Sequence, residues 1–248
     1  MRQAGITRKK ISVRRAPARK ILSLDEYGDD ILKLDDQIRT LPADSHLVFA
    51  DECVFSARGF KMSAWSNPHE NIEVEDRSRN QPCQAVCAAV CSCHGLLAVR
   101  TVDYSFDQER FQDFLTDVSS AVDGEHVYLF LDNCRVHHGK LVKYADYNIT
   151  PIWNVAYHFV YNDACEKYWA QLKAHFRPLL LQKMLTRPHA KDPVLQKAVR
   201  ETLHAVPTDS IPLFVAHGLR ALRHDANLVR RQRGLQPVPY DEPPEKKV

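Results

Sequence analysis

Two hydrophobic segments that each end on an aspartate constrain the fold of this chain most strongly. Asp51 follows the run LVFA, and Asp132 follows the run VYLFL. Short apolar runs rich in β-branched and aromatic residues are typical of buried strands. An acid at the tip of such a strand can leave the core for a cleft. The sequence therefore predicts a sheet that carries two carboxylates at its strand ends.

A third acid, Glu166, lies in the helix-like segment NDACEKYWAQLK. Asn162 or Asp163 is a good N-cap residue for this helix, and Asn162 is also expected to help orient the site. The apolar stripe of the helix consists of Cys165, Trp169, Leu172 and Phe176. With this stripe turned inward, we expect Glu166 to reach the two strand-end aspartates.

Three converging carboxylates are a suitable ligand set for Mg²⁺, which prefers oxygen ligands. Two such ions about 3.5–4 Å apart can activate a nucleophile and stabilise the leaving oxygen of a phosphodiester. We predict that Asp51, Asp132 and Glu166 are the metal ligands. Asn133 and His137 are expected to orient them through hydrogen bonds. Each acid alone also fits a turn, cap or first-turn helix position, so only the combination favours a metal site.

The other segments predict an α/β fold built on one mixed sheet flanked by helices. Strands are predicted for residues 46–55, 58–65, 83–93, 96–102, 127–131 and 149–153. The first two of these strands are expected to pair as one hairpin and the next two as a second hairpin. Their alternation with helical segments is that of a sheet with helices packed on its faces.

Helices are predicted between and after these strands. Ser105 and Gln108 form a possible capping box, and the helix after it has the apolar face Phe111, Phe114, Leu115 and Val118. Further helices are predicted at 25–39, near 138–147, after Asp192-Pro193, and from Ser210 towards Gly234.

The positive charge is concentrated near the two ends of the sequence. The net charge is only +3, but the first twenty residues contain eight Lys or Arg and no acid. A basic stretch can bind phosphate backbones or can be a solvated tail, and both interpretations stay open. The candidate DNA-binding residues are Arg8, Lys9, Lys10, Arg14, Arg15, Lys173, Arg230 and Arg231.

The seven cysteines predict reduced thiols in an intracellular protein, because no export signal accompanies them. No apolar run approaches the roughly 18 residues that a membrane span needs. Cys83, Cys87, Cys91, Cys93 and His94 could bind zinc, but they lack a paired Cys-x-x-Cys knuckle. Their alternating small-residue context favours strand packing instead.

Other side chains near the acids have two interpretations each. Cys53, Cys134 and Cys165 lie close to the proposed ligands, where core packing is favoured over a nucleophilic role. His138, like His137, could lie near the metal or order its loop. Trp153, Tyr157 and Phe159 could stack on bases or pack over the cleft.

The combined pattern resembles the DDE transposases of the Tc/mariner superfamily, particularly their bacterial insertion-sequence-like branch. The strings FADECVF, LFLDNCRVHH and NDACEKYWAQLK look like the three catalytic blocks of that family. The 33 residues between Asp132 and Glu166 fit the separation found there, and Asn162, Trp169 and Lys173 match the third block. The resemblance covers about residues 5–180.

This resemblance implies a ribonuclease-H-like fold, dependence on Mg²⁺ or Mn²⁺ with two bound ions, and cut-and-paste DNA transposition. Asp51, Asp132 and Glu166 would be the catalytic residues and metal ligands. Double-stranded DNA would be the partner, a homodimer the working form, and an intracellular compartment with DNA the location. A catalytically inactive DNA-binding descendant and a nuclease that cuts without joining are the alternative functions.

Two departures from the family pattern affect this interpretation. The segment before Glu166 lacks the proline-rich run that normally fixes the loop there, which predicts a less well preorganised glutamate. The N-terminal residues resemble the end of a DNA-binding region and the linker that follows it, so a helix-turn-helix module is expected to be separate or lost.

We divide the chain into four parts on this basis. Residues 1–44 are a basic, partly helical linker or arm, and 45–180 are a ribonuclease-H-like catalytic domain. Residues 181–235 are expected to be a helical C-terminal extension, and 236–248 a disordered, proline-rich tail.

Overall fold

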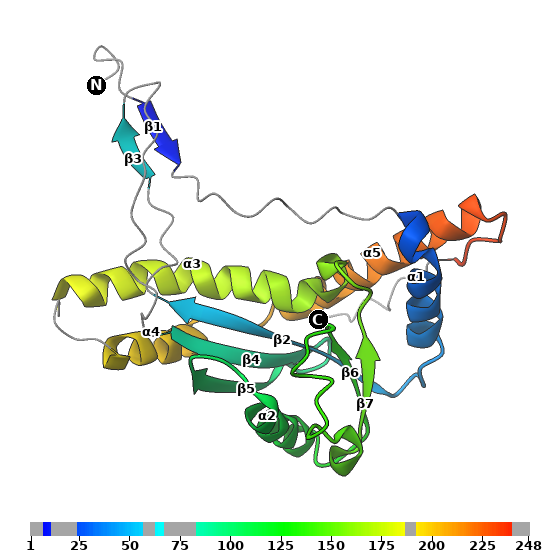
Figure 1. Cartoon of the computed structure of the whole chain (residues 1–248), viewed down its shortest axis with the longest axis horizontal. Helices are drawn as coiled ribbons and strands as arrows, with labels where there is room; N and C mark the ends of the chain where they lie inside the picture. The colour runs from blue at the N-terminus through cyan, green and yellow to red at the C-terminus, as the bar shows by residue number, and fades with distance from the viewer. Residues whose placement is uncertain (1–6, 11–23, 57–62, 67–82, 187–191, 240–248) are drawn as a thin grey trace.

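A five-stranded mixed sheet forms the centre of the molecule (Figure 1). The computed structural model describes residues 7–10, 24–56, 63–66, 83–186 and 192–239. The strands of the sheet are β2 (His46–Ser56), β4 (Cys83–Cys91), β5 (Gly95–Asp103), β6 (Val127–Leu131) and β7 (Ile149–Trp153). They lie in the order β5-β4-β2-β6-β7, with β5, β4 and β2 antiparallel and β2, β6 and β7 parallel. The predicted mixed sheet is therefore confirmed.

Helices cover both faces of this sheet. In Figure 1, α2 (Gln108–Ala121) lies below it, α3 (Asp163–Thr186) lies above it, and α4 (Asp192–Ala205) lies under α3 at the left end of the strands. Helix α5 (Ile211–Gln232) shares the apolar cluster of α3 and α4, and α1 (Leu24–Arg39) packs against α5. The helices after α3 thus belong to the same core as the sheet, and the expected boundary at residue 180 falls inside α3.

Strand β2 sends alternate side chains to the two faces, because successive residues of a strand point in opposite directions. Phe49 and Cys53 join the apolar cluster on the α3 face, whereas Val48 and Ala50 join the cluster on the α2 face. By the same alternation Asp51 belongs to the α3 face, and its neighbour in sequence belongs to the α2 face.

The predicted pairing of β2 with residues 58–65 is wrong. Strand β3 (Ser63–Ser66) pairs with β1 (Thr7–Lys10) in a separate two-stranded antiparallel sheet. Both edges of β2 are already occupied, by β4 on one side and β6 on the other. The second predicted hairpin, β4 with β5, is confirmed with the turn at residues 92–94.

The predicted helix at 138–147 is also wrong, since only η3 (Tyr144–Tyr147) is helical there, as a single 3₁₀ turn. The capping box before α2 differs as well. Asp107 is the N-cap and accepts a hydrogen bond from the backbone N–H of Arg110 at 2.9 Å. Gln108 instead accepts one from the backbone N–H of Leu141 at 3.3 Å. Its side chain therefore holds the loop that replaces the expected helix.

Arg230 was expected to contact DNA, and the structure contradicts this. Its guanidinium is buried, with 6% of the residue exposed. It donates to Asp35 and to Asp36 at 2.8 Å each, and Arg223 donates to Asp35 as well. A basic side chain held by acids in this way fastens α5 to α1. None of the described helices combines the length and the apolar character that crossing a membrane requires.

Candidate active site

Asp51 is the centre of a group of acids on the α3 face of the sheet. Its Oδ2 accepts a hydrogen bond from the indole N–H of Trp169 at 3.0 Å. Its pKa is raised to about 7, first by burial and then by the negative charge of Glu52, while the bond from Trp169 opposes the rise. The charges of Glu166 and Asp132 raise this pKa further. The three predicted ligands are therefore close enough to repel one another.

Asp132 follows β6 directly and is held by two donors on one oxygen. Its Oδ1 accepts from the backbone N–H of Cys134 at 3.0 Å and lies 2.9 Å from Nδ1 of His137. Burial would raise the pKa of Asp132, but the hydrogen bonds from His137 and Cys134 outweigh it and the pKa is lowered. Both donors use Oδ1 and leave Oδ2 out of these two contacts.

His137 is buried and joins Asp132 to Glu52. Its Nε2 lies 2.9 Å from Oε1 of Glu52. Burial lowers the pKa of His137, but the two carboxylates outweigh burial and bring it to about 10. At neutral pH the ring is therefore an imidazolium, which donates one hydrogen bond to each acid. This chain of contacts fixes the loop after β6 to strand β2.

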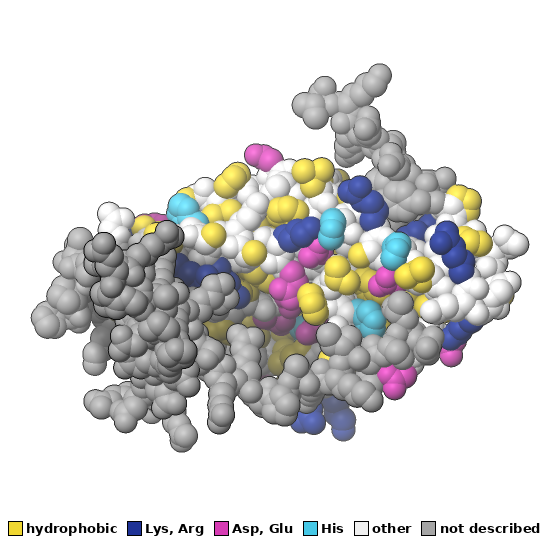
Figure 2. Space-filling model, turned by 90° about the horizontal axis from the view of Figure 1, so that it is seen from above, with side chains coloured by type: hydrophobic (Ala, Val, Ile, Leu, Met, Phe, Trp, Pro, Cys, Tyr) yellow, Lys and Arg dark blue, Asp and Glu magenta, His cyan; other side chains and the backbone are white. Residues whose placement is uncertain are grey.

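Glu166 lies in the first turn of α3 with its side chain exposed. The stripe predicted for this helix is buried, with Cys165, Trp169, Leu172 and Phe176 all in the main apolar cluster. Glu166 lies three residues before Trp169, so it is exposed at the edge of the helix face that meets Asp51. Figure 2 shows acidic side chains grouped near the middle of one face, with Lys, Arg and His side chains around them.

The start of α3 is tied to the sheet by Asn162. This buried side chain donates from Nδ2 to the carbonyl of Ala50 at 3.2 Å, one residue before Asp51. Asn133 acts in the loop after β6, where its Nδ2 donates to the carbonyl of Asn154 at 2.6 Å. Both asparagines thus hold the backbone around the acids.

Helix α5 holds the turn η4 (Phe159–Asn162) that leads into α3. The hydroxyl of Tyr161 donates to Asp225 at 2.8 Å. Gly218 of α5 lies so close that a Cβ there would be 2.8 Å from the carbonyl oxygen of Tyr161. These contacts hold the turn that leads into the helix of Glu166.

The remaining candidates are the basic residues that were predicted to bind DNA. Lys173 lies beside the Cys53 thiol, whose pKa is raised by burial against the effect of that ammonium group. Arg231 is exposed at the end of α5. Arg8, Lys9 and Lys10 lie in β1 without described side chains, and Arg14 and Arg15 lie outside the described residues.

The cysteines and aromatic residues near the acids divide between packing and exposure. Cys53 and Cys165 are buried in the core, as predicted, whereas Cys134 is exposed. His138 stacks on Trp153 with ring centroids 3.9 Å apart. Tyr157 and Phe159 remain exposed.

Two contributors to the site were missed as such by the sequence analysis. Glu52 holds His137 from the opposite face of β2, and the indole of Trp169 does more than pack. The signal for Glu52 was its adjacency to Asp51, since a strand places consecutive residues on opposite faces. For Trp169 the helical spacing predicted burial but could not reveal its hydrogen bond.

The acids fit a divalent cation. Their donor atoms are all carboxylate oxygens, which Mg²⁺ and Mn²⁺ accept. The mutual repulsion that raises the pKa of Asp51 is what a bound cation would relieve. The sheet, its flanking helices and the acids at β2, β6 and α3 define a ribonuclease-H-like domain of the polynucleotidyl transferase type.

The chain belongs to the DDE superfamily endonucleases, whose sequence profile matches residues 46–183, more than half of its length. This confirms the predicted family. A comparison with curated proteins found no match.

Solved structures of the Mos1 mariner transposase share the fold. The Mos1 transposase paired-end complex with left transposon end matches with a TM-score of 0.60 and 13% identity, over 88% of this chain and 66% of that one. The pre-cleavage Mos1 transpososome gives 0.60 and 12%, over 93% and 68%. The Mos1 catalytic domain gives 0.54 and 11%, over 88% and 97%. The chain thus spans about two thirds of the transposase in the first complex and nearly all of the isolated catalytic domain.

Proposed function

We propose that this protein is the catalytic domain of a DNA transposase, which cleaves DNA strands and transfers them by two-metal-ion phosphodiester chemistry. The observation that carries this proposal is the grouping of acids around Asp51, whose pKa is raised to about 7 first by burial and then by Glu52, with smaller contributions from the charges of Glu166 and Asp132. A structural role for three acids does not account for charge repulsion at a partly buried site. Membership of the DDE endonucleases supports the same reaction class.

The proposed metal ligands are Asp51, Asp132 and Glu166. Among the described residues these carboxylate oxygens do not all lie within 4.8 Å of one another. A wider set suits two ions about 3.5–4 Å apart better than one. Mg²⁺ is the proposed cofactor, and Mn²⁺ is expected to substitute for it. When bound, the ions activate the attacking oxygen and stabilise the leaving oxygen.

The residues of the chain prepare the site for this reaction. Trp169 keeps the carboxylate of Asp51 in one orientation by binding its Oδ2. His137 and the N–H of Cys134 hold Oδ1 of Asp132, and this leaves its second oxygen for an ion. The contacts of η4 with α5 would steady the turn before the helix that carries Glu166.

The proposed substrate is double-stranded DNA, both at the element ends and at the target. The Mos1 structures include complexes with a transposon end, which supports this choice. We propose Lys173 and Arg231, together with the basic residues of the N-terminal arm, as contacts to the phosphate backbone. A homodimer, and a separate module for end recognition, complete the proposal. The protein would act where the DNA is, in a nucleus or in a bacterial nucleoid.

A plasmid-nicking experiment tests this proposal. Supercoiled DNA is incubated with Mg²⁺ or Mn²⁺ and the wild type, the variant Asp132→Asn, or the control Asp146→Asn. Asp146 is an exposed acid of η3 outside the site. We expect metal-dependent nicking by the wild type and the control but not by Asp132→Asn. Nicking that survives in Asp132→Asn would remove the acidic site from the reaction.

A joining assay separates the proposed transposase from the two alternatives. Labelled DNA ends with a free 3′-hydroxyl are incubated with plasmid, and covalent joining is measured. Joining supports strand transfer, whereas nicking without joining indicates a nuclease on the same fold. DNA binding with neither reaction indicates a non-catalytic DNA-binding protein.

A further inference from the structure

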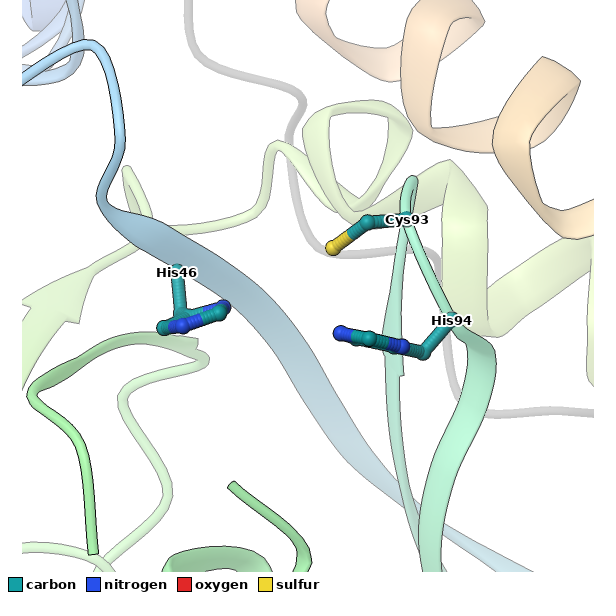
Figure 3. Close-up of side chains that lie close together, drawn as sticks. All are labelled: His46, Cys93 and His94. Atoms are coloured by element: carbon teal, nitrogen blue, oxygen red, sulfur yellow. The ribbon is translucent and has the colours of Figure 1, made fainter. Parts of the chain in front are cut away.

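The start of β2 carries a second cluster of metal-binding side chains, shown in Figure 3. His46 is the first residue of β2, and Cys93 and His94 lie in the turn between β4 and β5. One ligand atom from each of the three side chains lies within 4.8 Å of the others. In the part of the chain that the structure describes, no other group of three His, Cys, Asp or Glu side chains meets this condition.

This cluster is separate from the acidic site. His46 precedes Asp51 by five residues on one strand, which corresponds to roughly 16 Å along β2. The imidazole of His94 and the thiol of Cys93 are directed toward His46 from the neighbouring turn (Figure 3). Cys93 and His94 are exposed and His46 is partly exposed, so an ion can enter from solvent.

A carboxylate orients the histidine of this cluster. Oε2 of Glu125 lies 2.6 Å from Nε2 of His46. A histidine that binds a metal through one ring nitrogen almost always donates its other N–H to a carboxylate, carbonyl or water. With Glu125 on Nε2, Nδ1 of the same ring is the nitrogen left for an ion.

A buried thiol supports the cysteine of the cluster. The Sγ atoms of Cys91 and Cys93 are 3.4 Å apart, and the backbone N–H of His94 donates to the sulfur of Cys91. Either sulfur can donate its S–H to the other, so Cys91 helps to hold the side chain of Cys93 in place.

We propose that His46, Cys93 and His94 form a binding site for a zinc ion. Two imidazoles and one thiolate are ligands that Zn²⁺ accepts in tetrahedral geometry, with a water in the fourth position. On binding, the S–H bond of Cys93 breaks, the sulfur keeps the electron pair and bonds to Zn²⁺, and the proton leaves to solvent. The ion would clip the β4–β5 turn to the beginning of β2.

The cluster is not the zinc set that was considered from the sequence. Cys87 lies in the core at the middle of β4, and Cys83 lies at the other end of that strand. The decisive ligand is His46, which precedes Cys93 by 47 positions in the sequence and reaches it through the pairing of β2 with β4.

Titration with Co²⁺ tests the site without relying on activity. The full chain is freed of metal with a chelator, kept reduced, and titrated with Co²⁺ while the thiolate-to-cobalt absorption band is recorded. The variants are Cys93→Ser, His46→Ala and Glu125→Gln. The control is Cys134→Ser, because Cys134 is also exposed but lies beside the acidic site.

We expect a band that saturates at one equivalent of Co²⁺ and disappears when Zn²⁺ is added. It should be absent in Cys93→Ser, strongly weakened in His46→Ala, and unchanged in Cys134→Ser. Glu125→Gln should lower the affinity by about 10–100-fold. A band that persists in Cys93→Ser, or that is lost in Cys134→Ser, would overturn the proposal, as would no band at all in the wild type.

Discussion

The first residue and the middle of strand β2 offer metals different chemistry. Around Asp51 the donors are carboxylate oxygens, and the pKa of that acid is raised first by burial and then by the charges of the neighbouring acids. At His46 the neighbouring donors are a second imidazole and a thiol, with only Glu125 as an acid. Oxygen donors favour Mg²⁺ and Mn²⁺, whereas imidazole and thiolate favour Zn²⁺. A single strand can therefore present two sites of different metal preference.

The two sites also differ in how they are held. The buried side chains of His137 and Trp169 fix the acids of the proposed catalytic site. At the start of β2 a surface turn carries two of the ligands, and an exposed carboxylate orients His46. Buried contacts therefore hold the acidic site, whereas a surface turn and one exposed carboxylate hold the cluster at His46.

The largest effect is expected from removing the charge of Asp51 at the acidic site. Asp51→Asn should lower metal-dependent DNA nicking by on the order of 10³-fold or more, because several kcal/mol of transition-state stabilisation depend on the bound ions. The Co²⁺–thiolate band that Cys93 gives should be unchanged. Nicking rates and cobalt titrations on the same preparation measure both.

The reciprocal variant completes this test. Cys93→Ser should lose the cobalt band and keep the nicking rate of the wild type. If Asp51→Asn also abolished the cobalt band, the acidic site and the His46 cluster would be one coupled site rather than two separate ones.

A smaller effect is expected from the buried histidine that links the acids. His137→Gln removes the positive charge between Asp132 and Glu52 while retaining hydrogen-bonding groups. Loss of a group that orients a metal ligand typically costs about 10–100-fold in metal affinity or activity. We expect a loss in that range, measured as the Mg²⁺ concentration needed for half-maximal nicking.

Glu52→Gln provides the matched comparison for this effect. It removes the far carboxylate but leaves the contact between His137 and Asp132, so its loss should be smaller than that of His137→Gln. A loss as large as that of Asp51→Asn would instead make Glu52 a direct ligand.

Much of this arrangement could be predicted from local sequence patterns. Apolar runs predicted β2, β6 and the acids after or within them, and helical spacing predicted the buried stripe of α3. The contacts that shape the site could not be predicted in this way. The bonds of His137 to Glu52 and of Trp169 to Asp51 join residues 85 and 118 positions apart. The order of the strands and the packing of α3 on the sheet bring these residues together.

The wrong predictions have the same origin. Residues 63–66 alternate like a strand, but local pattern cannot show that both edges of β2 are occupied by β4 and β6. Arg230 looks like any basic residue near a helix end until α1 places Asp35 and Asp36 against it. Sequence patterns describe single elements, and partners are chosen by the packing of all of them.

Replacing Gly218 should disturb the acidic site around Asp51 but not the His46 cluster. Gly218→Ala places a Cβ 2.8 Å from the carbonyl oxygen of Tyr161, a backbone atom that cannot move aside easily. Overpacking of this kind destabilises by about 1–3 kcal/mol, although alanine favours a helix over glycine by about 1 kcal/mol. We expect lower thermal stability and slower nicking, with an unchanged cobalt band.

Gly28→Ala is the matched control for that variant. Gly28 also lies in a helix, but its added Cβ would meet side-chain atoms, the end of Arg233 at 2.7 Å and Cγ1 of Val229 at 3.0 Å, rather than backbone. Its loss of stability should therefore be smaller than that of Gly218→Ala. Equal losses in the two variants would show that space at η4 is not the cause.

The last expected effect is the pH dependence that Asp51 gives to the metal-free chain. Its pKa is about 7 in the folded protein and about 3.9 when unfolded, so between these values the folded state holds a proton that the unfolded state has released. Stability should therefore fall as the pH rises from about 4 to about 7, and then level off with respect to this group. The lowered pKa of Asp132 has the opposite effect, because it makes stability rise with pH at the acid end of the range. The raised pKa of His137 makes stability fall as the pH rises above about 6.5.

The difference in unfolding free energy between the wild type and Asp51→Asn isolates the contribution of Asp51. Adding Mg²⁺, which binds the ionised carboxylate, should reduce this difference at pH 7, whereas Zn²⁺ bound at His46 should not. A difference that is flat between pH 4 and pH 7 would mean that neither burial nor the neighbouring acids raise the pKa of Asp51, and the contrast between the two sites on β2 would then rest on ligand type alone.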